Sequence, residues 1–189
     1  MTNSAGIDYQ QLVHDIIKGN RVAMQEMYNL TVRNMTAVCT RYVVNQDDVK
    51  DVLQESYLKA FSGIRTFTPH DENSLMAWLR RIVVNESLML LRRKKRLNLL
   101  VNIDDVEEDI PEPELTASAS TMDIGDLMAL IQQLPDGYRT ILNLYAIEKI
   151  PHSRIASMLG ISEGTSASQY YRARKQLAKL ILKHQNKEL

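Results

Sequence analysis

Cysteine, glycine, proline and phenylalanine are all scarce in this 189-residue chain. The single cysteine, Cys39, excludes an intramolecular disulfide and any zinc site built on several cysteines. We interpret it as a buried small apolar residue, since it lies in a largely apolar stretch. Seven glycines, five prolines and two phenylalanines are few for a β-rich fold. Nine methionines and abundant Leu, Ala, Gln and Lys favour helix, so we expect an all-α protein.

Long apolar runs are also missing. The first ten residues contain no apolar core of signal-peptide length, and the apolar runs at 82–84 and 88–91 are far too short to cross a bilayer. A hydrophobic content of 44% with 24% charged residues is typical of a folded soluble protein. We therefore expect a cytoplasmic protein without membrane insertion.

The zero net charge conceals an uneven distribution. Residues 1–103 carry 14 basic and 10 acidic side chains, a balance of +4, and residues 122–189 carry 9 and 6, a balance of +3. Residues 104–121 hold seven acids and no base. This acidic segment also contains Pro111, Pro113 and a Thr/Ser/Ala run, which cannot bury enough apolar surface to fold alone. We predict two basic modules, 1–103 and 122–189, joined by a mobile acidic linker.

The N-terminal module is predicted to contain three helices. Asn20 is a plausible cap for a helix that runs to about Val44. Residues 46–61 repeat apolar side chains at the spacing of one buried helical face, with a polar face opposite. The apolar set is Val49, Val52, Leu53, Tyr57, Ala60 and Phe61, and the polar set is Asp48, Asp51, Glu55 and Lys59. A polar loop at 62–74 precedes a third helix from about Ser74 to Arg96.

Five consecutive basic residues, 92–96, end that third helix. A solvated basic tail is the ordinary interpretation of such a run. Here, however, the helix contains Trp78, and the preceding loop carries Arg65 and Phe67. Cations beside aromatic rings are suited to holding single-stranded DNA, so this combination indicates a nucleic-acid site.

The C-terminal module is predicted to be helical throughout. We expect helices at 122–134, ended by Pro135, then at 136–149 and 150–158, a turn at 159–162, and a long helix from Glu163 to about His184. In the second of these, Tyr138, Ile141, Leu142 and Tyr145 should share one buried face.

The last two helices have the spacing of a helix-turn-helix. Ala156 is small where the helices cross, and Gly160 can adopt the left-handed turn conformation. Such a unit places its second helix in the major groove. The candidates for base contacts are Thr165, Ser168, Gln169, Tyr171 and Arg172, and those for phosphate contacts are Arg174, Lys175 and Lys179. An ordinary three-helix bundle with a solvated basic helix remains the alternative interpretation.

Taken whole, the chain resembles the extracytoplasmic-function (ECF) sigma factors of the sigma-70 superfamily. Residues 47–61 resemble the helix that docks on RNA polymerase, and residues 78–96 the helix that reads and melts the downstream, minus-ten element. Residues 134–177 resemble the module that reads the upstream, minus-thirty-five element. The acidic segment takes the place of the family linker. The resemblance implies core RNA polymerase and promoter DNA as partners, an anti-sigma factor as a further partner, and no cofactor.

The resemblance also implies roles for individual residues. Trp78 would stay in the core beneath the melted strand. The core-polymerase contacts would be Asp48, Asp51, Gln54 and Glu55. The downstream-element contacts would be Arg65, Phe67, Asn85, Arg92 and Arg93. The upstream-element contacts would include Ser168, Tyr171 and Arg172.

Three positions depart from the pattern of many relatives. Arg154 replaces an acid that helps to order the helix-turn-helix, and Met89 replaces an aspartate. Ala167 replaces a basic residue, which predicts weaker binding to the upstream element.

Two other classes of protein remain as alternatives. A two-module transcriptional regulator would bind duplex DNA through the helix-turn-helix without being a polymerase subunit. Its difference from a sigma factor would lie in residues 47–61, which would not bind core polymerase. An enzyme is disfavoured because the four histidines are scattered and no glycine-rich phosphate loop or metal-ligand spacing is present.

Overall fold

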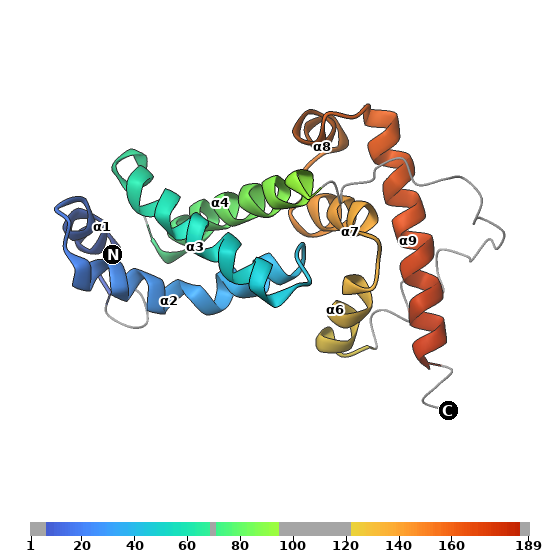
Figure 1. Cartoon of the computed structure of the whole chain (residues 1–189), viewed down its shortest axis with the longest axis horizontal. Helices are drawn as coiled ribbons and strands as arrows, with labels where there is room; N and C mark the ends of the chain where they lie inside the picture. Colours follow the sequence, from blue (N-terminus) through green and yellow to red (C-terminus); the bar gives the residue numbers. More distant parts are fainter. Residues whose placement is uncertain (1–6, 69–70, 95–121, 186–189) are drawn as a thin grey trace. The chain divides into compact units, whose positions relative to one another are not determined.

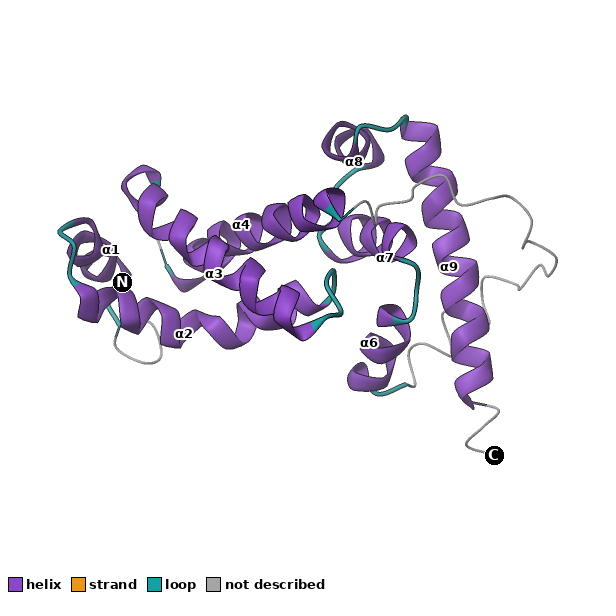
Figure 2. Cartoon of the chain, in the orientation of Figure 1, coloured by secondary structure: helices purple, strands orange, loops and turns teal. Residues whose placement is uncertain are grey.

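The computed structural model describes residues 7–68, 71–94 and 122–185, and every regular element in these ranges is helical (Figure 2). The all-α prediction is therefore confirmed. Contacts divide the chain into a first unit, Met1–Leu91, and a second, Arg92–Leu189. The predicted linker at 104–121, its boundaries and Lys95 and Arg96 of the basic run lie outside the described residues.

The first unit is built on four α-helices within its described part (Figure 1). They are α1 (Tyr9–Ile17), α2 (Arg21–Thr40), α3 (Gln46–Gly63) and α4 (Glu72–Arg93), with a 3₁₀ turn, η1 (Ile64–Thr66), after α3. Helix α1 was not among the predicted helices. Its signal is present in the sequence, because the Asp8 side chain caps it and the buried residues Tyr9, Leu12, Val13 and Ile16 have helical spacing.

Side-chain caps explain where these helices begin. Asn20 Oδ1 accepts a hydrogen bond from the backbone N–H of Val22, and Asn45 Oδ1 does the same for Asp47. The predicted start of α4 near Ser74 is late by two residues. Asp71 Oδ1 accepts from the Ser74 backbone N–H at 2.8 Å, and Ser74 Oγ accepts from the Asp71 N–H at 3.2 Å. This reciprocal pair begins the helix at Glu72, two residues earlier than we expected.

The core of the first unit confirms the predicted apolar face of 46–61. Val49, Val52, Tyr57 and Ala60 are all buried, although Phe61 is only partly so. Cys39 on α2 is 0% exposed, as expected of a packed apolar residue. Burial raises the pKa of its thiol to about 11.

A buried hydrogen-bonded pair joins α2 to α3. The Thr31 hydroxyl donates to the Met27 carbonyl at 2.7 Å, which leaves its oxygen to accept from the Tyr57 hydroxyl, also at 2.7 Å. Desolvation raises the pKa of Tyr57 to about 12.

This pair predicts an asymmetry between two substitutions. Thr31→Val should lower the free energy of unfolding by about 1–3 kcal/mol, because it leaves the buried Tyr57 hydroxyl without its acceptor. Tyr57→Phe should cost only about 0.5–1.5 kcal/mol, because Thr31 still donates to Met27.

Because the folded-state pKa of Tyr57 is raised, this tyrosine should make the parent lose stability as pH rises from about 10 to about 12, and Tyr57→Phe should remove that loss. Urea denaturation would measure both, and equal costs would contradict the assigned donor directions.

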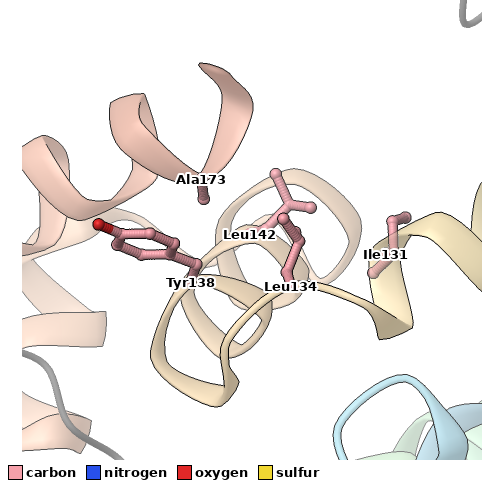
Figure 3. Packing of buried hydrophobic residues seen from close by; sticks show 5 residues of the cluster. All are labelled: Ile131, Leu134, Tyr138, Leu142 and Ala173. Carbon is pink, nitrogen blue, oxygen red and sulfur yellow. The ribbon is translucent and has the colours of Figure 1, made fainter. Parts of the chain in front are cut away.

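The second unit is arranged around one long helix (Figure 1). Its elements are α6 (Ile124–Gln132), α7 (Asp136–Leu142), the π-helical turn η2 (Asn143–Ile147), α8 (His152–Leu159) and α9 (Glu163–Gln185). Helix α9 contacts α8, α7 and α6 along its length. Side chains from α6, α7 and the link between them gather beneath α9 (Figure 3). This cluster consists of Ile131, Leu134, Tyr138, Leu142 and Ala173.

Arg139 holds the α6–α7 link from inside the second unit. It is 2% exposed, and its Nη1 donates to the carbonyls of Leu134 at 2.7 Å and Gln132 at 3.2 Å. Its Nη2 pairs with Asp136. The buried charge is therefore compensated, and carbonyls that end α6 have a partner.

The predicted helix at 136–149 is helical from 136 to 147, but only Asp136–Leu142 is α-helical. From Asn143 the chain forms a π-turn, in which the Glu148 N–H donates to the Asn143 carbonyl at 2.9 Å. This i→i+5 turn is wider than an α-turn and changes the phase of the side chains that follow. Tyr138, Ile141 and Leu142 are buried as predicted, but Tyr145 is 36% exposed.

Candidate nucleic-acid and polymerase surfaces

Three of the four residues on α3 that we predicted to contact core polymerase are exposed. Asp51, Gln54 and Glu55 are exposed, whereas Asp48 is 7% exposed. The exposure that we expected of Asp48 is wrong, because it lies one helical turn before the buried Val52, at the edge of the apolar face. Leu58, one turn after Gln54, is 56% exposed and extends the same face. Leu58 was not predicted as a contact, since a leucine in a helix is usually part of the core.

Lys59, which we predicted on the polar face of α3, forms an ion pair with α4. Its Nζ lies 2.7 Å from Glu86 Oε1 on α4, where the glutamate side chain is only 10% exposed. This ion pair joins α3 to α4 beside Asn85. Neither residue was paired in the sequence analysis, because a contact between positions 27 apart leaves no local signal.

The predicted downstream-element residues gather on the start and outer face of α4. The rings of Phe67 and Trp78 stack with centroids 4.7 Å apart and an interplanar angle of 19°. Trp78 is partly exposed, so the expected position in the core is wrong, and Phe67 covers one face of its ring. Asn85 lies two turns after Trp78 and therefore on the same face of the helix, and it is exposed.

Basic residues flank this aromatic pair and continue along α4. Arg65 in η1 is exposed, as is Arg81, one turn after Trp78. Arg92 and Arg93, in the last turn of α4, are exposed too. A stacked aromatic pair, an exposed amide and several cations on one helix can grip a phosphate backbone and receive an unstacked base.

The predicted turn at 159–162 lies between α8 and α9. Gly160 has φ +70° and ψ +36°, and its N–H donates to the Ala156 carbonyl at 2.8 Å. Ile155 and Ala156 are buried, as a helix-turn-helix requires. The Ser162 side chain then begins α9 by accepting from the Thr165 N–H at 2.9 Å.

The outer face of α9 carries most of the predicted upstream-element residues. Ser168 and Tyr171 are exposed and Arg172 is partly exposed, while Thr165 is partly buried with its hydroxyl 2.8 Å from Ser162 Oγ. Gln169 is 3% exposed, so its side chain cannot reach a base in this arrangement. The physical reason is its position between Ser166 and Ala173, both 0% exposed, on the inward stripe of α9.

Two of the predicted phosphate contacts lie against tyrosine rings. Lys175 Nζ is 5.0 Å from the centroid of Tyr171, and the Arg174 guanidinium carbon is 5.9 Å from that of Tyr170. These cation–π contacts pre-order both side chains. Lys179 is exposed further along the helix.

Within residues 7–68, 71–94 and 122–185, no helix is both long and apolar enough to span a membrane. The same ranges contain no group of three or more His, Cys, Asp or Glu side chains placed to hold a metal ion.

Comparison with known proteins relates each unit to a region of the sigma-70 factors. Residues 27–97 match sigma-70 region 2, and residues 124–177 match sigma-70 region 4. The RNA polymerase sigma factor SigV of Bacillus subtilis is 30% identical over 134 residues, which cover 71% of this chain and 76% of SigV. The ECF RNA polymerase sigma-E factor of Haemophilus influenzae is 28% identical over 184 residues, 91% of this chain and 94% of that protein. The chain belongs to the ECF sigma factors of the sigma-70 family.

One further relative is longer than this sigma factor. The ECF RNA polymerase sigma factor SigE of Mycolicibacterium smegmatis is 31% identical over 143 residues, which cover 74% of this chain and 54% of SigE. The region 2 match includes all of α3, so a regulator that only binds duplex DNA is not favoured. Sigma factors are a non-enzymatic class of transcription initiation factor.

Two residues in the region 4 unit of this sigma factor have a positive φ angle, one a glycine and the other a lysine. Gly160 has φ +70°, and Lys149, after the π-turn, has φ +57°. Gly160→Ala should lower the free energy of unfolding by about 1–2 kcal/mol, because the left-handed backbone region is strained for a residue with a Cβ. No atom lies within 4 Å of the added Cβ, so a steric clash should not increase this cost. Lys149→Gly should raise the free energy of unfolding by up to about 1 kcal/mol for the converse reason. Thermal denaturation would measure both, and a stabilising Gly160→Ala would contradict the turn geometry.

Proposed function

We propose that this sigma factor directs core RNA polymerase to promoters by dividing the work between its two units. In this proposal the exposed face of α3 docks on core polymerase, α4 with η1 holds the melted downstream element, and α9 reads the upstream element. The observation that carries the proposal is the pairing of two exposed faces, on α4 and α9, with region 2 and region 4 matches in the order that this division needs.

Docking would rest on Asp51, Gln54 and Glu55, with Leu58 as an apolar contact at the end of the same face. Two carboxylates and an amide on one exposed helical face are complementary to a basic surface. Asp48 is left out of the contact because it is buried.

Strand opening would use the Phe67–Trp78 stack as a platform and Asn85 as the group that holds an extruded base. An asparagine amide offers both a donor and an acceptor to a base edge, and an aromatic ring replaces the stacking that the base loses. Arg65, Arg81, Arg92 and Arg93 would bind the phosphates on either side.

Upstream recognition would use Ser168, Tyr171 and Arg172 at base edges, with Arg174, Lys175 and Lys179 at phosphates. We propose that the protein works in the cytoplasm without catalytic chemistry or cofactor, and that an anti-sigma factor restrains it, as the family resemblance implies. Residues 104–121 would serve as the linker between modules 1–103 and 122–189.

Salt dependence distinguishes positioning contacts from reading contacts on α9. Arg174→Ala with Lys175→Ala should weaken polymerase–promoter binding about equally on every sequence, and should reduce the slope of log K against log salt by about 2. Ser168→Ala with Arg172→Ala should instead relax discrimination at particular base pairs, by about 1–3 kcal/mol for each lost contact. Filter binding at several salt concentrations, on parent and base-substituted promoters, measures both effects. An unchanged base preference in the second variant would contradict the assignment.

A further inference from the structure

His152 connects three elements of the second unit at the point where α8 begins. Its Nδ1 lies 2.9 Å from Ser166 Oγ on α9. Its ring stacks on Tyr145 of the π-turn, with centroids 4.0 Å apart and an interplanar angle of 7°. Tyr170, also on α9, lies beside the ring at 5.8 Å. One imidazole therefore contacts η2 and two successive turns on one face of α9.

Ser166 is an unusual residue for its position. It is 0% exposed and lies on the inward stripe of α9, in line with Gln169 and Ala173. The buried packing of α8 nearby is aliphatic, from Ile155 and Ala156, and such contacts have little directional preference. A hydrogen bond does have one, since it weakens steeply when its angle changes. The His152–Ser166 bond thus adds a directional restraint on the rotation of α9 about its own axis to the restraint that packing supplies.

The stack with Tyr145 explains how the imidazole keeps its direction. The π-turn moves Tyr145 out of the buried face of α7 and into contact with His152. A nearly parallel ring restricts the plane of the imidazole, so Nδ1 stays aimed at Ser166. The irregular turn and the histidine therefore act together on α9.

We infer that His152 is a positioning residue for upstream promoter recognition: it sets the rotation of the recognition helix α9 through Ser166. The inference rests on the proposed function of α9. A rotation of about 10° moves a side-chain tip about 6 Å from the helix axis by roughly 1 Å, which is enough to break a hydrogen bond to a base. Ser168 and Arg172, on the outer face, would lose base contacts while the fold is kept.

Three substitutions separate the hydrogen bond from the stack. His152→Phe keeps an aromatic ring against Tyr145 but removes the bond to Ser166. His152→Asn places an amide atom where Nδ1 was and can keep the bond without the ring. Ser166→Ala removes the bond from the other side with the smallest change in volume. The pairing of His152→Phe with Ser166→Ala gives a double-mutant cycle.

Core polymerase loaded with each full-length variant should be titrated with a parent promoter and with one that has a single base pair changed in the upstream element. We expect His152→Phe and Ser166→Ala each to reduce the affinity ratio between the two promoters about tenfold. The double variant should be no worse than either single one, and His152→Asn should retain most of the ratio. Retained discrimination in both His152→Phe and Ser166→Ala overturns the inference and leaves the proposed function standing. A parent protein that shows no preference overturns both.

A spectroscopic measurement on the free, full-length protein tests the bond itself. Long-range ¹H–¹⁵N correlation spectra report the state of each imidazole nitrogen. Ser166→Ala should shift the Nδ1 resonance of His152 and leave that of His14, which is exposed on α1, unchanged. An unshifted His152 Nδ1 shows that the bond is absent and overturns the inference, even if a variant at position 152 fails to fold.

Discussion

Replacing Asp51 and Glu55 together by lysine should weaken binding to core RNA polymerase at least tenfold. Both carboxylates are exposed on α3, and each charge at the edge of such an interface contributes roughly 0.5–2 kcal/mol against a basic partner. Reversal replaces two attractions by two repulsions. The effect should shrink as salt rises, because exposed charges are screened. Fluorescence anisotropy of a labelled sigma factor titrated with core enzyme measures the affinity.

A matched control keeps the change in net charge but moves it elsewhere on the same unit. Asp15→Lys with Glu26→Lys alters α1 and α2 by the same four charges and should leave core binding nearly unchanged. Circular dichroism of the α3 variant should match the parent, because its substituted side chains are exposed. Undiminished binding by Asp51→Lys with Glu55→Lys would rule out α3 as the docking face.

The second large effect is expected at Asn85, after the promoter duplex has been bound. Asn85→Ala should reduce open-complex formation on duplex promoters tenfold or more. Holding an extruded base must offset an unstacking cost of a few kcal/mol, and losing its amide partner removes part of that compensation. Permanganate footprinting of unpaired thymines measures the fraction of open complexes.

A pre-melted promoter supplies the internal control for Asn85, because its bases are already unpaired and the cost has been removed. On this template Asn85→Ala should form complexes nearly as well as the parent. Asn34→Ala, at an exposed asparagine on α2, should behave like the parent on both templates. Equal losses on duplex and pre-melted DNA would give Asn85 a structural role instead of a base contact.

The sequence predicted burial well where the chain forms a regular helix packed on one side. The apolar repeat of 46–61 predicted which face of α3 is buried. In a helix packed on one side, the apolar residues at helical spacing form the stripe that faces the core. The prediction failed at Asp48, which lies at the edge of that face, where a shift of a few tenths of a turn decides between solvent and interior. The prediction for Gln169 failed because this polar residue lies on the inward stripe of α9, between the buried Ser166 and Ala173.

Long-range contacts and irregular backbone could not be predicted. The π-turn after Leu142 has no strong residue signature, so Tyr145 was assigned to a face that the real backbone turns away from. The sequence shows His152 only as one of four scattered histidines, because its partners, Tyr145 and Ser166, are brought to it by that turn and by the return of α9. The Lys59–Glu86 pair was hidden in the same way.

The central claim, that this chain directs polymerase to promoters, is tested most directly by sequencing the 5′ ends of transcripts made in vitro. Genomic DNA should be transcribed by core RNA polymerase alone and by core polymerase with the full-length protein. The account predicts that the added protein produces discrete new 5′ ends, each preceded by a shared pair of sequence elements at minus ten and minus thirty-five. The Asp51→Lys, Glu55→Lys protein should lose all of these 5′ ends together. Transcripts that start at the same places with and without the protein would contradict the account.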